Sequence, residues 1–194
     1  MDIVIATNNI GKVKEIKAIL SGHNVMSQSE AGLHVEPVED GDSFAANALI
    51  KARALRELTD MAVIADDSGI EVDALGGAPG IYSARFAGEH GTPEQCNEKM
   101  LKSLEGVPFE KRTARYVCAM ALIEPNGCEN VFEGTCEGYI IDECRGTNGF
   151  GYDPMFYKPE FDKTFGELDS ALKDKVSHRY NALKKLSDYL DSQC

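Results

Sequence analysis

The chain has 194 residues, and its 43% of hydrophobic and 27% of charged residues are typical of one globular domain with a substantial core, which excludes disordered, fibrous and collagen-like classes. Its 32 acidic residues outnumber its 20 Lys and Arg residues and leave a formal net charge of −12. A surface of that sign repels nucleic-acid backbones and anionic lipid, so we expect neither nucleic acid nor a membrane among its partners.

The first third of the chain alternates strand and helix signals. Residues 2–7 form a short β-branched run that predicts a buried strand, and the polar turn after it leads into a helix from Lys12 onward. A second strand is expected over 24–27. Ser43 is a candidate cap for a helix through Leu58, which feeds a buried strand over 61–65.

That last strand runs straight into Asp66, Asp67, Ser68 and Gly69, where we expect it to end. Two carboxylates then lie at its carboxyl end, the edge where ligands of α/β sheets bind. Adjacent carboxylates resist joint ionisation unless a cation compensates, and such hard oxygen ligands suit Mg²⁺ held partly by substrate phosphates. The alternative interpretation is a solvated turn.

The second half of the chain begins with a glycine-rich stretch over 76–91, which we expect to be a long, ordered functional loop. A helix is predicted over 92–104. Residues 112–123 and 131–141, separated by a Pro-Asn-Gly turn, predict long antiparallel strands that are candidates for a second lobe. A final helix is predicted from about Ser177 to Leu190.

The sequence contains neither the pattern of a secretion signal nor that of a membrane-spanning helix. No run approaches the roughly 20 apolar residues of a spanning helix, and no basic stretch precedes an apolar one at the start. The six cysteines form no CxxC pair, so we interpret them as reduced and mostly buried rather than as disulfides or zinc ligands. We therefore expect a cytoplasmic protein.

Two segments favour binding of a phosphorylated ligand. The segment TNNIGK, residues 7–12, leads from a strand into a helix, so free backbone N–H groups and Lys12 can converge on phosphate. It lacks the spacing of a P-loop, and a purely structural turn stays an alternative. An acidic stretch with Glu36, Glu39 and Asp40 precedes the helix that carries Lys51, and it is either solvated or a source of metal ligands.

Two further segments favour binding of a base. In NGFGYDP, residues 148–154, glycines permit close approach of the backbone, and Phe150 and Tyr152 offer flat faces to a nucleobase unless both belong to the core. Lys173 and the run of His178 and Arg179 gather hydrogen-bond donors near the start of the last helix. Positive charge is unfavourable at a helix N-terminus, so a carbonyl-rich or anionic ligand would offset the charge of these donors.

Six segments occur together in the order and approximate spacing of one known family: TNNIGK, the acidic loop before SFAANALIKA, ADDSG, LGGAPGIYSAR, GTNGFGYDPMF and SHR. From Ile3 to Leu190 the chain resembles the non-canonical purine NTP pyrophosphatases, typified by inosine triphosphate pyrophosphatase. The resemblance implies an α/β fold with an elongated mixed β-sheet and flanking helices. Residues 1–194 would form a single pyrophosphatase domain with two lobes and a central active-site cleft, assembled as a homodimer.

The resemblance also implies the reaction, which is Mg²⁺-dependent hydrolysis of ITP, dITP and XTP to the monophosphate and pyrophosphate, cleansing the nucleotide pool. Asp67 maps to the proton acceptor and a metal ligand, with Asp66 and Lys12 as its catalytic neighbours. Which of the two aspartates is the base stays open. Glu39 maps to the second metal ligand, with Glu36 or Asp40 as alternatives.

The substrate-binding residues carried over from the same family fall into three groups. The triphosphate would be held by Thr7, Asn8, Asn9, Ile10, Gly11, Lys12 and Lys51, with Ser68 also contacting substrate. The nucleoside would lie against Phe150, Gly151, Tyr152 and Asp153, with Phe150 stacking on the purine. Lys173, His178 and Arg179 would hydrogen-bond the base. The family often has an acidic residue before that lysine, where this chain has Leu172.

Two rival functions stay open at this point. One is a related pyrophosphatase for modified pyrimidine nucleotides, because the phosphate and metal residues do not choose the base. The other is a catalytically silent nucleotide-binding module, against which the intact Lys12, Lys51, Asp66 and Asp67 argue.

Overall fold

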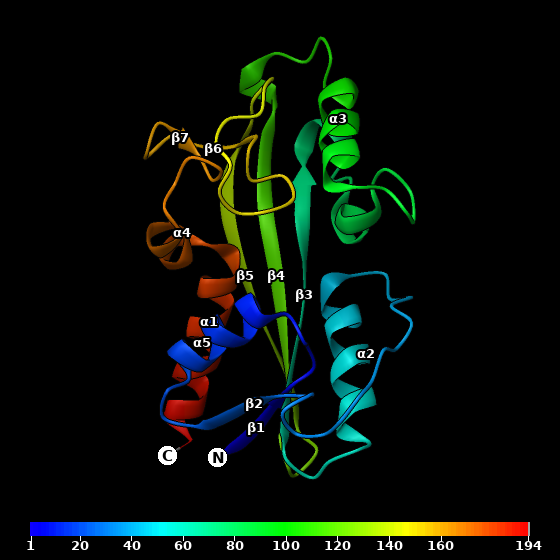
Figure 1. Ribbon diagram of the computed structural model, residues 1–194, viewed down its shortest axis with the longest axis vertical. Coiled ribbons are helices and arrows are strands. Elements are labelled where there is room, and N and C mark those ends of the chain that lie inside the picture. Colours follow the sequence, from blue (N-terminus) through cyan, green and yellow to red (C-terminus); the bar gives the residue numbers. More distant parts are fainter. Residues whose placement is uncertain (194) are drawn as a thin grey trace. The chain divides into compact units, whose positions relative to one another are not determined.

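The computed structural model describes residues 1–193. Its strands form one seven-stranded sheet in the order β2-β1-β3-β4-β5-β6-β7 (Figure 1). Their bounds are β1 Asp2–Ile5, β2 Asn24–Ser27, β3 Ala62–Val72, β4 Thr113–Ile123, β5 Glu129–Ile140, β6 Phe156–Lys158 and β7 Lys163–Thr164. β1 is parallel to β2 and β3, whereas β6 is antiparallel to β5 and β7. The prediction of a mixed sheet with flanking helices is confirmed.

The chain divides into two compact units. The first unit comprises residues 1–68, 118–134 and 179–194, and the second comprises 69–117 and 135–178. Within residues 1–193 no helix has the length and apolar character needed to cross a membrane.

In the first unit, helices pack on both faces of the sheet. Ile3 and Ile5 of β1 belong to one buried cluster with side chains of α1, Ile10–Ile19, and of α5, His178–Ser192. Val4 lies between them in β1, is equally buried, and points to the other face, because successive strand residues alternate. Helix α2, Phe44–Arg56, lies on that other side of the sheet (Figure 1). Ser43 caps it as predicted, since its side chain accepts the N–H of Ala46.

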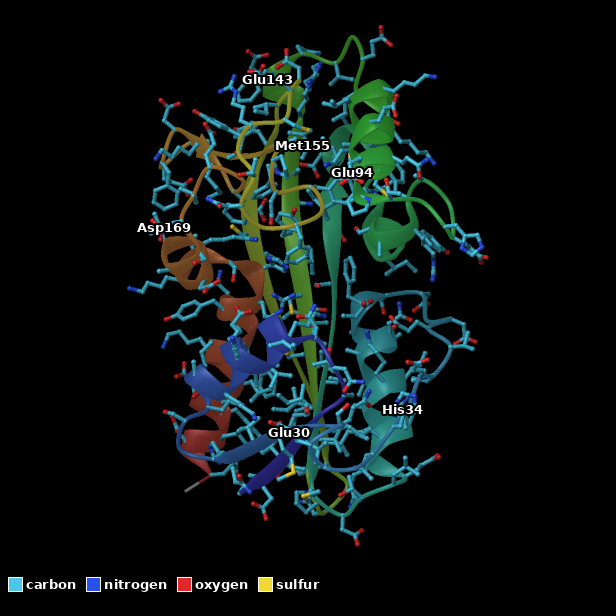
Figure 2. The ribbon with its side chains drawn as sticks, in the orientation of Figure 1. Glu30, His34, Glu94, Glu143, Met155 and Asp169 are labelled. Atoms are coloured by element: carbon cyan, nitrogen blue, oxygen red, sulfur yellow. The ribbon has the colours of Figure 1, made fainter. Side chains whose placement is uncertain are left out.

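The second unit has its own buried cluster, in which β3, β4 and β5 pack against α3, Pro93–Ser103, and against the segment that contains Met155 (Figure 2). Thr92 caps α3 and forms a reciprocal capping box with Gln95. A short helix, α4, Ser170–Val176, carries Lys173 and is capped by Asp169. Core and caps together fix the backbone that presents the polar residues described below.

Two predicted boundaries are wrong in ways that affect the site. β3 does not end at Ala65 but continues to Val72, because apolar Ile70 and Val72 extend its buried side in the second unit. The last helix, predicted from about Ser177 to Leu190, is confirmed as α5, whereas the short helix α4 before it, separated from α5 by Ser177 in an extended conformation, was not predicted. The helix expected from Lys12 begins at Ile10. The glycine-rich stretch is ordered and contains a 3₁₀ helix over Gly80–Arg85.

Candidate active site

Asp66 and Asp67 lie within β3 and not in a turn after it. β1 pairs with β3 up to Ile64 and then ends, so both aspartates lie just beyond the carboxyl end of a parallel neighbour. Strand alternation sends the two side chains to opposite faces. Asp66 points to the face covered by α1 and α5, and Asp67 to the face covered by α2.

The side chain of Asp66 is 2% exposed and is surrounded by cations. Lys12 Nζ lies 3.0 and 2.8 Å from its two carboxylate oxygens, and Arg179 Nε lies 3.6 Å from Oδ2. Burial alone would raise the pKa of Asp66, but the positive charges of Lys12 and Arg179 outweigh it and hold this pKa well below the usual range. Asp66 is therefore ionised at neutral pH.

Arg179 is held from a second side by α1. Its Nη1 donates to Glu15 Oε2 at 3.2 Å, and the side chains of both residues are buried or nearly so. Glu15 stands three positions after Lys12, which places the two on one face of the helix. Lys12, Asp66, Arg179 and Glu15 thus form a chain of alternating charge that fixes the position of the Lys12 ammonium group.

Asp67 has different surroundings on the opposite face. Lys51 Nζ lies 3.4 Å from Asp67 Oδ1 and 3.1 Å from Glu39 Oε2, and Asn47 donates to Asp67 Oδ2 at 3.2 Å. Burial raises the pKa of Asp67, and the charge of Lys51 only partly opposes this. Burial lowers the pKa of Lys51, but Asp67 and Glu39 outweigh that effect and raise it.

The oxygen atoms of Glu39 and Asp67 converge on the same lysine ammonium, so the two carboxylates already share one cation. Two hard oxygen ligands fit Mg²⁺, which keeps several waters and takes further ligands from phosphate. Among residues 1–193 no group of three or more His, Cys, Asp or Glu residues forms a complete protein cage for a metal. Asp40, an alternative to Glu39, is exposed, and Glu36 lines the pocket described next.

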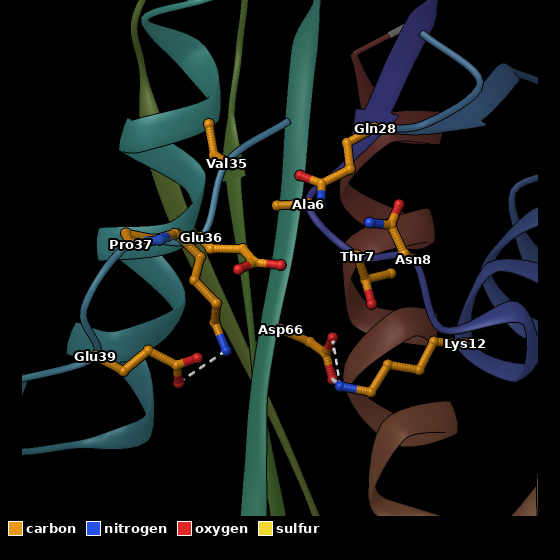
Figure 3. A pocket seen from close by; sticks show the side chains of 11 residues that line it. Ala6, Thr7, Asn8, Lys12, Gln28, Val35, Glu36, Pro37, Glu39 and Asp66 are labelled. Atoms are coloured by element: carbon orange, nitrogen blue, oxygen red, sulfur yellow. Dashed lines mark hydrogen bonds and ion pairs between the residues drawn. The ribbon is translucent and has the colours of Figure 1, made fainter. Parts of the chain in front are cut away.

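A pocket of about 370 Å³ lies beside these groups in the first unit (Figure 3). It is lined by Ala6, Thr7, Asn8, Lys12, Gln28, Val35, Glu36, Pro37, Glu39, Lys51 and Asp66. Its walls therefore carry two ammonium groups, three carboxylates and two amides. A polyanion accompanied by a divalent cation matches this mixture of charges.

The N-terminus of α1 differs from the prediction of free backbone donors. Asn9 is the cap, and its Oδ1 accepts the N–H groups of Gly11 and Lys12 at 3.0 and 3.2 Å. Thr7 Oγ1 in turn accepts the N–H of Asn9. Because these amides are already satisfied, the donors left to an anion in the pocket are mainly side chains. Ile10, also predicted to bind substrate, has a 72% exposed side chain.

In the second unit, Asp153 organises the segment predicted to bind the base. Its carboxylate is 3% exposed and accepts hydrogen bonds from Lys173 Nζ at 2.5 Å, from the Phe150 N–H at 2.8 Å and from the Tyr116 hydroxyl at 3.1 Å. Gly149 has a φ of +77°, and a Cβ there would lie 2.1 Å from Asp153 Oδ2. This position therefore requires glycine.

The two aromatic residues of this segment differ in exposure to solvent. Phe150 is 67% exposed, with Lys173 Nζ 5.0 Å from its ring centroid, so its ring is free to stack on a ligand. Tyr152 is 4% exposed, and its hydroxyl donates to the carbonyl of Ser83. The prediction that Tyr152 offers an open face is wrong because this side chain is part of the core. The carbonyl of Gly151 accepts from Asn97.

His178 and Arg179 do not act side by side. Successive helix residues point about 100° apart. The His178 ring stacks on Tyr116, with centroids 4.8 Å apart, in the second unit, whereas Arg179 joins Asp66 and Glu15 in the first. Ser68 is half-buried in β3.

Four residues of the networks and of the pocket were not predicted from the sequence: Glu15, Gln28, Asn47 and Tyr116. Helical spacing offered a signal for two of them, since Glu15 follows Lys12 by three positions and Asn47 precedes Lys51 by four.

Cys118, on β4, lies near Asp66, and burial together with the charge of Asp66 raises the pKa of its thiol. The five described cysteines are free, as predicted.

Comparison with known proteins yields matches along nearly the whole chain. A model described as the Ham1 family matches residues 3–189. The chain is 52% identical over 193 residues to a dITP/XTP pyrophosphatase of Desulforamulus reducens, covering 98% of this chain and 96% of that protein. It is 50% identical over 190 residues to a dITP/XTP pyrophosphatase of Halalkalibacterium halodurans, covering 97% and 98%. The solved structure of the Staphylococcus aureus Ham1 protein matches with a TM-score of 0.93 at 42% identity, covering 100% of both chains.

Proposed function

Because the chain belongs to the Ham1 family, we propose that it hydrolyses non-canonical purine nucleoside triphosphates, namely ITP, dITP and XTP, to the monophosphate and pyrophosphate. Relatives about half identical over their full length are dITP/XTP pyrophosphatases. The observation that carries the proposal is the pair of aspartates on opposite faces of β3, each matched with a lysine beside one polar pocket.

Mg²⁺ is the proposed metal, held by Glu39 and Asp67. Their shared contact with Lys51 supports this assignment, since both carboxylates already orient toward one positive charge. When bound, Mg²⁺ would supply Lewis-acid polarisation of the phosphates. Lys51 would then move from the carboxylates to a phosphate oxygen, where its charge serves the substrate.

Asp67 is the proposed general base, and Asp66 supports the reaction indirectly. A base must accept a proton, and burial already favours the protonated form of Asp67. Asp66 is held as an anion by Lys12 and Arg179, so it is a poor proton acceptor. Asp67 would remove a proton from a water molecule that attacks the α-phosphorus in line, and Lys12 and Lys51 would offset charge on the departing pyrophosphate.

Base recognition is proposed for the second unit. Phe150 would stack on the purine, while Lys173 and His178 would donate to the carbonyl at C6 of hypoxanthine or xanthine. Adenine carries an amine there, so such donors would be left without partners when ATP enters. Asp153 holds Lys173 and the Phe150 backbone in place for this purpose.

The test is to incubate the purified protein with Mg²⁺ and each of ITP, XTP, dITP, GTP, ATP and dUTP, resolving pyrophosphate from orthophosphate. Selective release of pyrophosphate from ITP, dITP and XTP is expected. Orthophosphate would move the attack to the γ-phosphorus. A preference for dUTP would instead indicate a pyrimidine enzyme, and tight ITP binding without turnover would indicate a silent nucleotide-binding module.

We also propose that the protein is a cytoplasmic homodimer, as the family resemblance implies. Sedimentation velocity across a range of concentrations tests the oligomeric state, and a monomer at micromolar concentration would contradict it. Cell fractionation tests the compartment.

A further inference from the structure

Gln28 is a buried polar residue that no catalytic or substrate assignment above uses. It directly follows β2, is 4% exposed, and lines the pocket. Its backbone is fully engaged, since its N–H donates to Ile5 and its carbonyl accepts from Leu33. Its side-chain Oε1 has no hydrogen-bond partner among residues 1–193. A buried amide oxygen left without a partner is costly, so its presence at a pocket wall points to a ligand.

The neighbouring residue prepares a second amide on the same wall. Ser29 Oγ donates to Asn8 Oδ1 at 2.5 Å. This contact satisfies the oxygen of Asn8 and leaves its amide nitrogen as the group offered to the pocket. Figure 3 shows that nitrogen on the pocket side, near Gln28.

The backbone donors next to this wall are occupied, because Asn9 caps the N–H groups of Gly11 and Lys12. An anion at this wall therefore depends on the side-chain amides of Asn8 and Gln28. Figure 3 shows Gln28 beside Ala6 and across the pocket from Glu39, the proposed metal ligand. A phosphate chain whose reacting end lies at the metal would place its far end at Gln28.

We propose that Gln28 binds the pyrophosphate end of the substrate, with Ser29 acting as a positioning residue that aims Asn8 at the same phosphates. This inference rests on the proposed function, since it takes a nucleoside triphosphate as the ligand. Phosphate oxygens accept hydrogen bonds, so Gln28 serves them through its Nε2, which a half-turn of the amide exchanges with Oε1. Gln28 thereby distinguishes the leaving group from the nucleotide that remains.

Gln28→Met tests the proposal, because it keeps the length of the side chain and removes the amide. The two probes are inorganic pyrophosphate and IMP, each titrated calorimetrically in the presence of Mg²⁺. A hydrogen bond to a charged group predicts a loss of about tenfold or more in pyrophosphate affinity. IMP, which lacks the β- and γ-phosphates, should bind as it does to the wild type. Gln28→Glu should weaken pyrophosphate further by adding a negative charge.

Ser27→Ala is the matched control. Ser27 is a buried polar residue at the same strand end, but it does not line the pocket, and its hydroxyl accepts the N–H of Glu30. Its substitution should leave both affinities unchanged. Gln28→Met should unfold at a temperature no lower than the wild type, because it removes a polar atom that had no partner.

An unchanged pyrophosphate affinity in Gln28→Met overturns the proposal. Equal weakening of pyrophosphate and IMP also overturns it, since that result indicates a general structural role. The proposed function fails separately, if the wild-type protein releases no pyrophosphate from ITP. In that case a selective effect of Gln28→Met on pyrophosphate binding would still establish the contact.

Discussion

The two faces of β3 place neighbouring aspartates in contrasting electrostatic surroundings. On one face Asp66 is enclosed by Lys12 and Arg179, and its pKa is held well below the ordinary range. On the other face Asp67 shares Lys51 with Glu39, and burial raises its pKa. The comparison teaches that residue type alone does not determine a carboxylate's role. The number of cations around the carboxylate sets its charge state and therefore its role.

The largest expected effect is on catalysis by Asp67. Asp67→Asn removes the proposed base and one metal ligand, so turnover of ITP should fall by at least about 10²-fold while the fold persists. Initial rates of pyrophosphate release measure the loss, and circular dichroism checks the fold. Near-normal turnover in this variant would transfer the role of base to another group.

The next largest effect is on stability and concerns Asp66. Asp66→Asn leaves the buried cations of Lys12 and Arg179 without their anion, which should cost about 3–5 kcal/mol of unfolding free energy. Urea denaturation gives the value. Asp67→Asn is the matched comparison, and it should cost far less because burial already disfavours the Asp67 charge. Equal losses in the two variants would contradict the proposed contrast.

A smaller effect separates the adjacent residues at the start of α5. His178→Phe keeps an aromatic ring against Tyr116 but removes the donors, so the ratio of kcat/KM for ITP over ATP should narrow by about tenfold. Arg179→Met should change that ratio less, because the guanidinium forms ion pairs with Asp66 and Glu15. A larger change in the Arg179 variant would return this residue to base recognition.

The smallest effect is the response of stability to mild acid. The lowered pKa of Asp66 means that its stabilising contribution is complete above the ordinary aspartate pKa and is lost as the pH falls toward the folded-state value. The raised pKa of Asp67 acts oppositely, since the folded state binds its proton first and gains stability as the pH falls.

These opposite signs give two opposite variant phenotypes. On acidification from about pH 7 to about pH 4, Asp66→Asn should lose less stability than the wild type, and Asp67→Asn should lose more. Urea midpoints at several pH values measure the slopes. Parallel slopes in all three proteins would show that neither carboxylate changes its pKa on folding.

Much of the fold followed from local patterns. The cap at Ser43 and the apolar strands were predicted because each depends on neighbouring residues alone. The length of β3 was not predicted, because a run of Asp-Asp-Ser-Gly is typical of turns. Only long-range ion pairs from α1, α2 and α5 make those charges tolerable inside a strand.

The candidate site was predictable where a motif carried the information and less so elsewhere. Lys12, Lys51 and the aspartates were found through their segments, and the structure brings them together with their partners. Arg179 was grouped with His178 because they are adjacent, but helix geometry separates them. Gln28 carries no motif, and its significance depends on burial and on a missing partner, which only coordinates reveal.

The alternation within β3 makes the spacing of this segment as important as its residues. Removal or insertion of one residue between Ala62 and Asp66 would shift every following side chain to the other face of the sheet. Asp66 would then face α2 and Asp67 would face α1, so both lysine pairings would be lost in one step. The segment should therefore tolerate apolar exchanges of similar volume far better than any change in its length.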